Sequence, residues 1–330
     1  MPVQGTDGSI DATKPALWAG DARELDALEN GAGVRTLEDH GGLLLTGEDR
    51  VDFLHGQVAN DVKGLQAGAL NDSLLLNHKG HALAQLRVLR GEGDLRVITE
   101  GNSLDTVHQS LDSHIIFDQV KLEKLDGHLT VTVQGPRAPQ VLEEALGIVP
   151  QDGRWEWIET GETGFIVAPS RRTGAGGFDI YTDQGSGEEL VQRLVQAGAL
   201  QVGRASLEVA RVEARIPTAW GEGGLGVLPQ EAGLEPLLSY RKGCYLGQEI
   251  MARIEARGNL RRGLELLQLE GTPEGGDRKV RSEGKLVGQL GSTVRHPERG
   301  VLGLAIVRND LQPEATVEVA GVAGRVVPGQ

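Results

Sequence analysis

The chain has 330 residues, enough for two or three domains, each with its own hydrophobic core. It carries 33 Lys and Arg against 47 Asp and Glu, a net charge of −14, which excludes a surface broadly suited to phosphate backbones. Any contact with nucleic acid must therefore be local. A single cysteine excludes an internal disulfide framework and a metal site built only from the cysteines of one protomer.

The N-terminal residues and the hydropathy of the chain bear on where the protein acts. Residues 1–14 are polar and show no apolar run after a basic start, so no secretory signal is predicted. No segment approaches the roughly 20 apolar residues that cross a membrane. We therefore expect a soluble, cytoplasmic protein without a membrane partner.

The first half of the chain alternates strand and helix patterns after a tail over residues 1–20. Residues 42–45 predict a short strand, and apolar residues at mostly four-residue spacing predict a helix over residues 49–62. Alternation over residues 82–88, a turn at 91–94 and an apolar run at 95–99 predict a β-hairpin. Residues 129–133 alternate apolar and polar side chains, which predicts a half-buried strand.

Two helices follow that strand. Gly135 and Pro136 end it, and a helix over residues 141–146 is expected to stop at Gly147. Ser186 and Glu189 form a capping-box pattern that predicts the start of a second helix, which Gly198 closes. The irregular order of strands and helices indicates an α+β fold and lacks the steady βαβ repeat of a doubly wound sheet.

The pattern changes near residues 258–263. Short strand-like runs at 264–269, 285–290, 301–308 and 316–319 are separated by Gly, Pro and charged turns. They predict a small separate β-barrel or sandwich at the C-terminus.

Two weak motifs are better explained without a ligand. Gly221, Gly223 and Gly226 satisfy G-x-G-x-x-G, but prolines flank the match and no strand or helix pattern adjoins it, which favours a turn-rich loop over a dinucleotide site. His78 and His81 could meet in a turn, yet no third ligand is suggested nearby. We expect surface histidines there and assign no metal site.

The segment from Tyr240 to Glu249 is more informative. Gly243 and Gly247 bracket Cys244, and a helix pattern follows, so the thiol would lie just ahead of a helix N-terminus. Free backbone N–H groups there, together with the cations of Arg241 and Lys242, would lower its pKa and make it reactive. The alternative is a small buried cysteine in a glycine turn, and the local chemistry leaves both open.

Residues 241–262 are also locally basic. They hold six cations and two anions, so the local charge is 6 − 2 = +4 in an otherwise acidic chain. Such a segment could receive a phosphate or an anionic ligand tail, although a solvated helix face explains the outer arginines equally simply.

These residues carry a family resemblance. The stretch from Lys242 to Glu249 matches all seven specified positions of the signature K-G-C-[FY]-x-G-Q-E of the YgfZ family, folate-binding relatives of the glycine-cleavage T protein. The likeness covers roughly residues 40–310 and extends, in order, through G-x-D-x-x-x-F-L-x-G-Q at 47–57, N-D-V at 60–62, Lys79-Gly80, Gly135-Pro136, R-x-E-A-x-I-P at 211–217 and P-Q-E-A-G-L at 229–234.

The resemblance implies an α+β folate-binding core of two lobes over residues 21–260, a C-terminal β-barrel over residues 261–330 and a loose tail over residues 1–20. It implies tetrahydrofolate as the cofactor, and iron–sulfur assembly proteins or client iron–sulfur enzymes as partners, with an effect on tRNA modification through a methylthiotransferase. It further implies functional or binding roles for a set of named residues. The functional pair is Cys244 with Lys242, and the cofactor-binding residues are Arg211, Glu213, Tyr245, Gln248 and Glu249.

Departures from the T-protein pattern leave its catalytic activity open. Ala84 and Gln85 stand near the position of an acidic pair of which one member is catalytic, and Ala175 replaces a glutamate that grips the pterin. Asn77 also stands where the family usually has an acidic residue. Aminomethyl transfer to or from tetrahydrofolate is therefore an alternative, as is a non-catalytic adaptor. Direct tRNA binding is disfavoured by the overall charge, except through residues 241–262.

Overall fold

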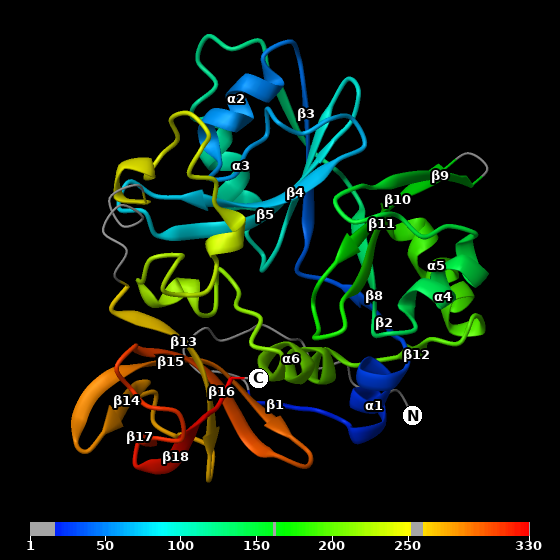
Figure 1. Ribbon diagram of the computed structural model, residues 1–330. Coiled ribbons are helices and arrows are strands. Elements are labelled where there is room, and N and C mark those ends of the chain that lie inside the picture. The colour runs from blue at the N-terminus through cyan, green and yellow to red at the C-terminus, as the bar shows by residue number, and fades with distance from the viewer. Residues whose placement is uncertain (1–16, 161–162, 252–259, 330) are drawn as a thin grey trace, which may run out of the picture.

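The computed structural model describes residues 17–160, 163–251 and 260–329. Within them the strands form a five-stranded sheet, a six-stranded sheet and a C-terminal sheet whose strands β13 to β18 close into an antiparallel barrel (Figure 1). The α+β fold with a C-terminal β-barrel is confirmed. The two sheets of the N-terminal part stand side by side above helix α6, and the barrel lies below it.

The five-stranded sheet has the order β4-β5-β6-β3-β7, and helices α2 (Arg50–Gln57) and α3 (Leu104–Asp112) cover it. The predicted hairpin is confirmed, with Leu86 opposite Thr99 and Arg90 opposite Leu95. The strands are β3 (Gly41–Thr46), β4 (Leu70–Leu76), β5 (Ala82–Arg90), β6 (Leu95–Thr99) and β7 (Lys121–Lys124).

Helix α2 is shorter than the helix predicted over residues 49–62. It ends at Gln57, and Val58 is extended, with φ −109° and ψ 159°. Val58 and Val62 are nevertheless fully buried against the same core, which explains why their spacing imitates a longer helix. The backbone N–H of Asn60 is taken by the Ser73 hydroxyl of β4, so the chain turns toward the sheet there.

The six-stranded sheet has the order β12-β2-β8-β11-β10-β9 and carries helices α1 (Ala22–Asn30), α4 (Ala138–Leu146) and α5 (Gln184–Gln196). The predicted alternation of residues 129–133 forms β8, where Val131 and Val133 are fully buried. The strands are β2 (Gly33–Leu37), β8 (His128–Gln134), β9 (Glu156–Thr160), β10 (Thr163–Ser170), β11 (Gly177–Asp183) and β12 (Leu200–Gln201).

The ends of α4 and α5 test the predicted caps. Gly147 is left-handed at φ 73° and ends α4, as predicted. The predicted capping box on Ser186 is wrong, because the N-cap of α5 is Asp183, whose carboxylate accepts the backbone N–H of Ser186 at 2.9 Å. The N-cap is thus an aspartate at the end of β11, three residues before the predicted Ser186, and its carboxylate accepts a free N–H group of the first helical turn.

The C-terminal strands are β13 (Arg262–Leu269), β14 (Lys279–Ser282), β15 (Lys285–His296), β16 (Gly300–Arg308), β17 (Thr316–Val319) and β18 (Val322–Val327). Helix α6 (Arg204–Glu213) packs Val209 and Val212 against this barrel. The short strand β1 (Trp18–Ala19) runs parallel to β15, so these two residues of the expected tail are part of the sheet. Residues 1–16 lie outside the described residues, and the predicted boundary at residue 260 adjoins a gap and stays a prediction.

Residues 214–247 run from α6 across the end of β4 and β5. The G-x-G-x-x-G match lies in turns and a single 3-10 turn, η1 (Gly223–Leu225), as the flanking prolines indicate; a second, η2 (Glu235–Leu237), follows. Among the described helices, none is long and apolar enough to span a membrane.

Two glycines that end elements differ in their surroundings and allow a matched test. Both have positive φ, but a Cβ on Gly135 would lie 2.5 Å from the carbonyl oxygen of Gly31, whereas a Cβ on Gly147 would meet nothing within 4 Å. We expect Gly147→Ala to lower the free energy of unfolding by about 1 kcal/mol, from left-handed strain alone. Gly135→Ala should cost about 3 kcal/mol, because backbone overlap is added. Urea unfolding of both variants checks this, and equal losses would contradict it.

Candidate functional site

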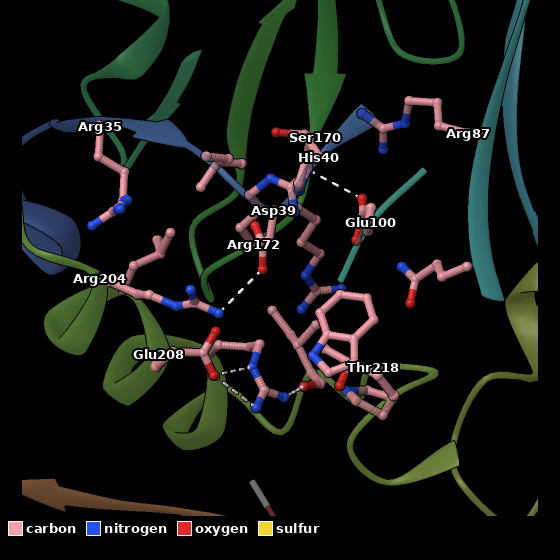
Figure 2. A pocket seen from close by; sticks show the side chains of 18 of the residues that line it. Arg35, Asp39, His40, Arg87, Glu100, Ser170, Arg172, Arg204, Glu208 and Thr218 are labelled. Atoms are coloured by element: carbon pink, nitrogen blue, oxygen red, sulfur yellow. Dashed lines mark hydrogen bonds and ion pairs between the residues drawn. The ribbon is translucent and has the colours of Figure 1, made fainter. Parts of the chain in front are cut away.

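A central cavity of about 120 Å³ lies where the two N-terminal sheets meet helix α6. Its walls come from residues 35–40 at the end of β2, from β4 and β5, from Glu100, from the Ser170–Arg172 segment, from α6 and from residues 216–220. Figure 2 shows arginine and carboxylate side chains converging on it from these separate elements. Its size is below the roughly 300 to 1,000 Å³ of sites that enclose a drug-sized ligand, so it suits a single ring system.

One fully buried charge beside this cavity is the side chain of Asp179 on β11. Its carboxylate accepts Nη2 of Arg172 at 2.7 Å and the Ser170 hydroxyl at 2.9 Å. Nη1 of Arg87, on β5, lies 3.5 Å away. Burial opposes ionisation of Asp179, but the charges of Arg172 and Arg87 outweigh it and hold its pKa below the usual range.

Both arginines are fixed by further carboxylates. Arg172 also donates to Glu100 at 3.1 Å, and Arg87 makes a two-point contact with Asp72 at 2.7 and 2.9 Å. Burial opposes the charge of each guanidinium, yet the surrounding carboxylates raise the pKa of both. The network therefore joins the two N-terminal sheets with charges that stay ionised.

Two polar atoms of the cavity wall have no partner in the described part of the chain. They are Nδ1 of His40 and Oε1 of Gln85, both shielded from solvent. Burial, followed by the charge of Arg172, lowers the pKa of His40 to about 3, so the imidazole is neutral at physiological pH. A buried acceptor without a donor is costly, so these atoms are suited to meet a ligand.

Arg211 is the predicted cofactor residue that lines this cavity. Its guanidinium donates to Glu208, to the Ile216 carbonyl at 2.6 Å and to the Ser292 hydroxyl of the barrel at 2.7 Å. Glu213, two residues later, lies elsewhere, in a cavity beside the barrel where Arg299 contacts it at 2.5 Å. Two positions along a helix point to different faces, which separates the pair.

The remaining predicted residues lie on the segment that crosses the turn between β4 and β5. Lys242 is buried, and its ammonium donates to the backbone carbonyls of His55, Val58 and Asn60 at the end of α2. Burial lowers its pKa to about 8, against the opposing charge of Asp61. All three N–H groups of the ammonium are thus used to tie the segment to α2.

The thiol of Cys244 is exposed, so the buried-cysteine alternative does not hold. Tyr245 is buried with its ring 4.8 Å from the Lys242 ammonium, and the next helix begins at Gln248, followed by Glu249. None of the described residues lining the central cavity belongs to this segment. The structure therefore brings Lys242, Cys244, Tyr245, Gln248 and Glu249 together, apart from Arg211 and Glu213, and their roles stay predictions.

The basic segment over residues 241–262 is only partly described, because Arg253, Glu255 and Arg257 lie outside the described residues. Arg262 makes a two-point ion pair with Glu231, with both contacts at 2.9 Å. The charge of Arg262 is therefore already neutralised by Glu231.

The departures from the T-protein pattern have definite places. Ala84 is buried in the core, Gln85 lines the central cavity, and Ala175 lies on the loop after β10. Asn77 shapes the turn between β4 and β5, because its side-chain oxygen accepts the N–H groups of Lys79 and His81. In residues 17–160, 163–251 and 260–329, no group of three or more His, Cys, Asp or Glu could hold a metal ion.

The sequence analysis missed Arg87, Glu100 and Arg172 as parts of the site. A signal exists for Arg87 and for Asp179: each is a charge inside a strand with an apolar residue on either side, Leu86 and Val88 or Phe178 and Ile180. A charge within a buried strand requires a partner of opposite sign. The sequence does not say which charges pair, because the partners lie on another sheet.

Two partly buried histidines, His40 and His128, predict a pH dependence of stability. Burial lowers the pKa of His128 to about 4, as it lowers that of His40 to about 3. Because the unfolded chain binds more protons than the fold between these values and about 6.5, stability falls as pH falls through this window. Each histidine contributes up to about 1.4 kcal/mol per pH unit. His40→Gln should flatten the dependence of urea midpoints between pH 6.5 and 4. Parallel curves for variant and parent would refute this.

Comparisons with known proteins give two kinds of relative at similar identity. An aminomethyltransferase from Nostoc sp. is 28% identical over 326 residues, 94% of this chain and 86% of that protein. One from Exiguobacterium sibiricum is 24% identical over 313 residues, 92% and 86% of the two chains. A tRNA-modifying protein YgfZ from Yersinia pestis is 28% identical over 298 residues, 86% of this chain and 87% of that protein.

The fold and the family follow from two further matches. The crystal structure of glycine cleavage system aminomethyltransferase T from Bartonella henselae superposes with a TM-score of 0.74 over 93% of this chain and 88% of that chain. Its sequence identity of 19% makes this a likeness of fold. The family described as GCVT N-terminal domain matches residues 6–242, so the chain belongs to that family.

Proposed function

We propose that the protein binds tetrahydrofolate and supports the assembly or repair of iron–sulfur clusters and, through iron–sulfur methylthiotransferases, tRNA modification. Cys244 is the functional thiol in this proposal. The observation that carries it is the exposed thiol on a segment that the buried Lys242 fastens to α2. The family match and the YgfZ relative, whose name describes a tRNA-modifying protein, support the same function.

The position of Cys244 suits chemistry with a macromolecular partner. The thiol is exposed, whereas its neighbours Lys242 and Tyr245 are buried and hold the segment in place. One thiolate cannot hold a cluster alone, so transient ligation would take its other ligands from a partner. Lys242 acts on the thiol by fixing the loop, since its N–H groups are donated to backbone carbonyls.

The central cavity is suited to the pterin ring of tetrahydrofolate. Oε1 of Gln85 would accept a ring N–H, and the neutral His40 would meet the polar edge of the ring with Nδ1. Arg211 contributes its side chain to the part of the cavity wall that α6 forms. When bound, the folate supplies a carrier for one-carbon units, while the protein orients the ring and keeps water away from it.

Aminomethyl transfer is the second candidate, because aminomethyltransferases are among the relatives. That chemistry calls for a carboxylate beside the reacting carbon, where this chain presents the neutral Gln85. The carboxylates that line the described cavity are each ion-paired with an arginine, namely Glu38, Asp39, Asp72, Glu100 and Glu208. A neutral amide and five neutralised carboxylates favour folate binding without this transfer.

Cys244→Ser should leave stability within about 0.5 kcal/mol of the parent, since the side chain is exposed, while abolishing support of methylthiotransferases. The measurement is the methylthio content of tRNA in cells that lack the native protein and express the variant. The matched control is a second small change at the surface, Ser113→Ala, at an exposed residue after α3.

Full tRNA modification in cells that express the Cys244→Ser variant would show that the thiol is not required. If Ser113→Ala also loses modification, low expression of both variants would explain the loss. That result would contradict a specific role for Cys244.

Gln85→Leu should weaken tetrahydrofolate binding roughly twofold to tenfold, because a neutral hydrogen bond contributes about 0.5 to 1.5 kcal/mol. Anaerobic calorimetric titration measures the dissociation constant, with Cys244→Ser as the control that keeps binding. This change is sharper than replacing Arg211, whose loss would leave the buried Glu222 carboxylate without its ion-pair partner.

No binding by the parent at millimolar tetrahydrofolate would reject the folate role and leave the adaptor as the better description. Formation of methylene-tetrahydrofolate from tetrahydrofolate and an aminomethylated carrier protein would instead establish the second candidate.

A further inference from the structure

The two most exposed large apolar side chains in the described ranges are neighbours on the loop between α3 and β7. Phe117 is 96% exposed and Ile116 is 72% exposed, whereas Leu286, the next in order, is 54% exposed. Single apolar residues scattered over a surface are normal, but adjacent ones that water surrounds are typical of a contact site for another molecule. This apolar pair, Ile116 and Phe117, is therefore a candidate contact outside the central cavity and the thiol segment.

The loop that carries the apolar pair is held at both ends. Ile115 and Val120 pack against the core of the five-stranded sheet. The carboxylate of Asp49 accepts the backbone N–H of Gln119 at 2.7 Å. Gly47 permits this close approach, because a Cβ there would lie 2.0 Å from the carbonyl oxygen of Gln119. A fixed loop thus presents the pair, so little conformational freedom is lost when a partner binds it.

Helix α2 connects this loop to the thiol segment. Asp49, at the start of α2, binds the loop, and carbonyls at the end of α2 accept the ammonium of Lys242, two residues before Cys244. Figure 1 shows the loop after α3 and the yellow segment at opposite ends of α2. The eight residues of α2 span about 12 Å. One short helix therefore sets the separation between the apolar pair and the thiol.

The surroundings of the apolar pair are acidic. Asp112 and Asp118 flank it in the sequence, and Glu48 lies beside Asp49, which contacts the same loop. Asp112, Asp118 and Glu48 are exposed, and none of them forms an ion pair with a residue that the structure describes. These three carboxylates form an acidic rim around the pair.

Cations on the adjoining elements are already engaged. Lys121 pairs with Glu123 at 2.9 Å, and Arg50 donates to the backbone carbonyls of Gly47 and Glu92. The acidic rim is therefore not neutralised by the protein itself. A partner that fits this surface has an apolar pocket with cations around it.

An enzyme that acts on tRNA has the matching charge. Such an enzyme neutralises phosphates with Lys and Arg, so its surface is basic around the bound nucleic acid. A second copy of this chain, with a net charge of −14, and a membrane with anionic lipids are both repelled by the acidic rim. Charge complementarity thus favours the tRNA-modifying client over these two occupants.

We propose that Ile116 and Phe117 anchor the client iron–sulfur methylthiotransferase, by inserting into an apolar pocket with a basic rim on that enzyme. This rests on the proposed function and adds to it the surface that recognises the client. An interface of standard size covers about 800 Å² on each partner, a patch roughly 30 Å across, so one interface includes both ends of α2. Cys244 then lies inside the contact, where the 41% exposed Leu246 adds apolar area.

The test measures anaerobic binding of the full-length protein to a purified methylthiotransferase that holds its clusters. Phe117→Ser should weaken binding roughly tenfold or more, as expected for an aromatic anchor, and Ile116→Ser should weaken it less. Neither change should move the urea midpoint, because both side chains are exposed. Leu286→Ser, at an exposed leucine of the barrel strand β15, is the matched control and should bind as the parent does.

The acidic rim is tested by the rate of association. Replacement of Asp112 and Asp118 together by Asn should slow association roughly threefold or more at low salt, and the difference should vanish at about 0.5 M salt. Glu298→Gln, at an exposed carboxylate of the barrel, is the control and should keep the rate of the parent.

The same variants in cells separate docking from the chemistry of the thiol. At low expression, Phe117→Ser should reduce the methylthio content of tRNA, and overexpression should restore it, because a higher concentration compensates for weaker binding. Cys244→Ser should bind the client within about threefold of the parent and should fail at either expression level.

Equal binding of the client by the parent, Phe117→Ser and Leu286→Ser would overturn the docking site. The proposed function would survive that result if Cys244→Ser still abolished modification. Self-association of the parent that Phe117→Ser abolishes, measured by sedimentation, would assign the pair to a contact between copies and overturn client docking. Partition onto phosphatidylcholine vesicles that Phe117→Ser abolishes would assign the pair to a membrane surface and also overturn it.

Discussion

The buried carboxylate of Asp179 is the interaction on which the arrangement of the N-terminal part depends. It lies on the six-stranded sheet and meets Arg87 from the five-stranded sheet, and both are shielded from water. A buried charge whose partner is removed is destabilising by about 3 to 5 kcal/mol, so the two sheets cannot separate cheaply. The relative position of the sheets, and with it the shape of the central cavity, follows from this constraint.

A second buried carboxylate with an arginine partner, Glu222 with Arg211, fixes the position of the barrel. Arg211 on α6 reaches the Ser292 hydroxyl of the barrel, and the buried Glu222 accepts the backbone N–H groups of Thr218 and Ser292. The floor of the central cavity is therefore made by a helix that is bound both to the barrel and, through Arg204 and Leu207, to the end of β2. Helix α6 also lines the cavity beside the barrel that contains Glu213, so one helix contributes to the walls of both spaces.

Local sequence patterns predict much of the fold but little of the site. The 82–99 hairpin, β8 and the end of α4 at Gly147 follow from periodicity and turn residues, which act within a few residues. The charge network depends on pairing between Arg87, Asp179 and Arg172 across two sheets, which no local pattern contains. The segment around Cys244 was located from its motif, but its exposure is set by the contact of Lys242 with the end of α2, 187 residues earlier in the sequence.

The pairing of β1 with β15 concerns the edge of the barrel. Strand β14 covers β15 up to Gln289, and Trp18 and Ala19 lie beside Val294 and Arg295, further along the same edge. An uncovered strand edge offers free N–H and C=O groups to any other chain, which is the usual start of edge-to-edge aggregation. Strand β1 thus covers part of the edge of β15. A shortened form that starts after residue 20 would leave the backbone N–H and C=O groups of this edge free to pair with another chain.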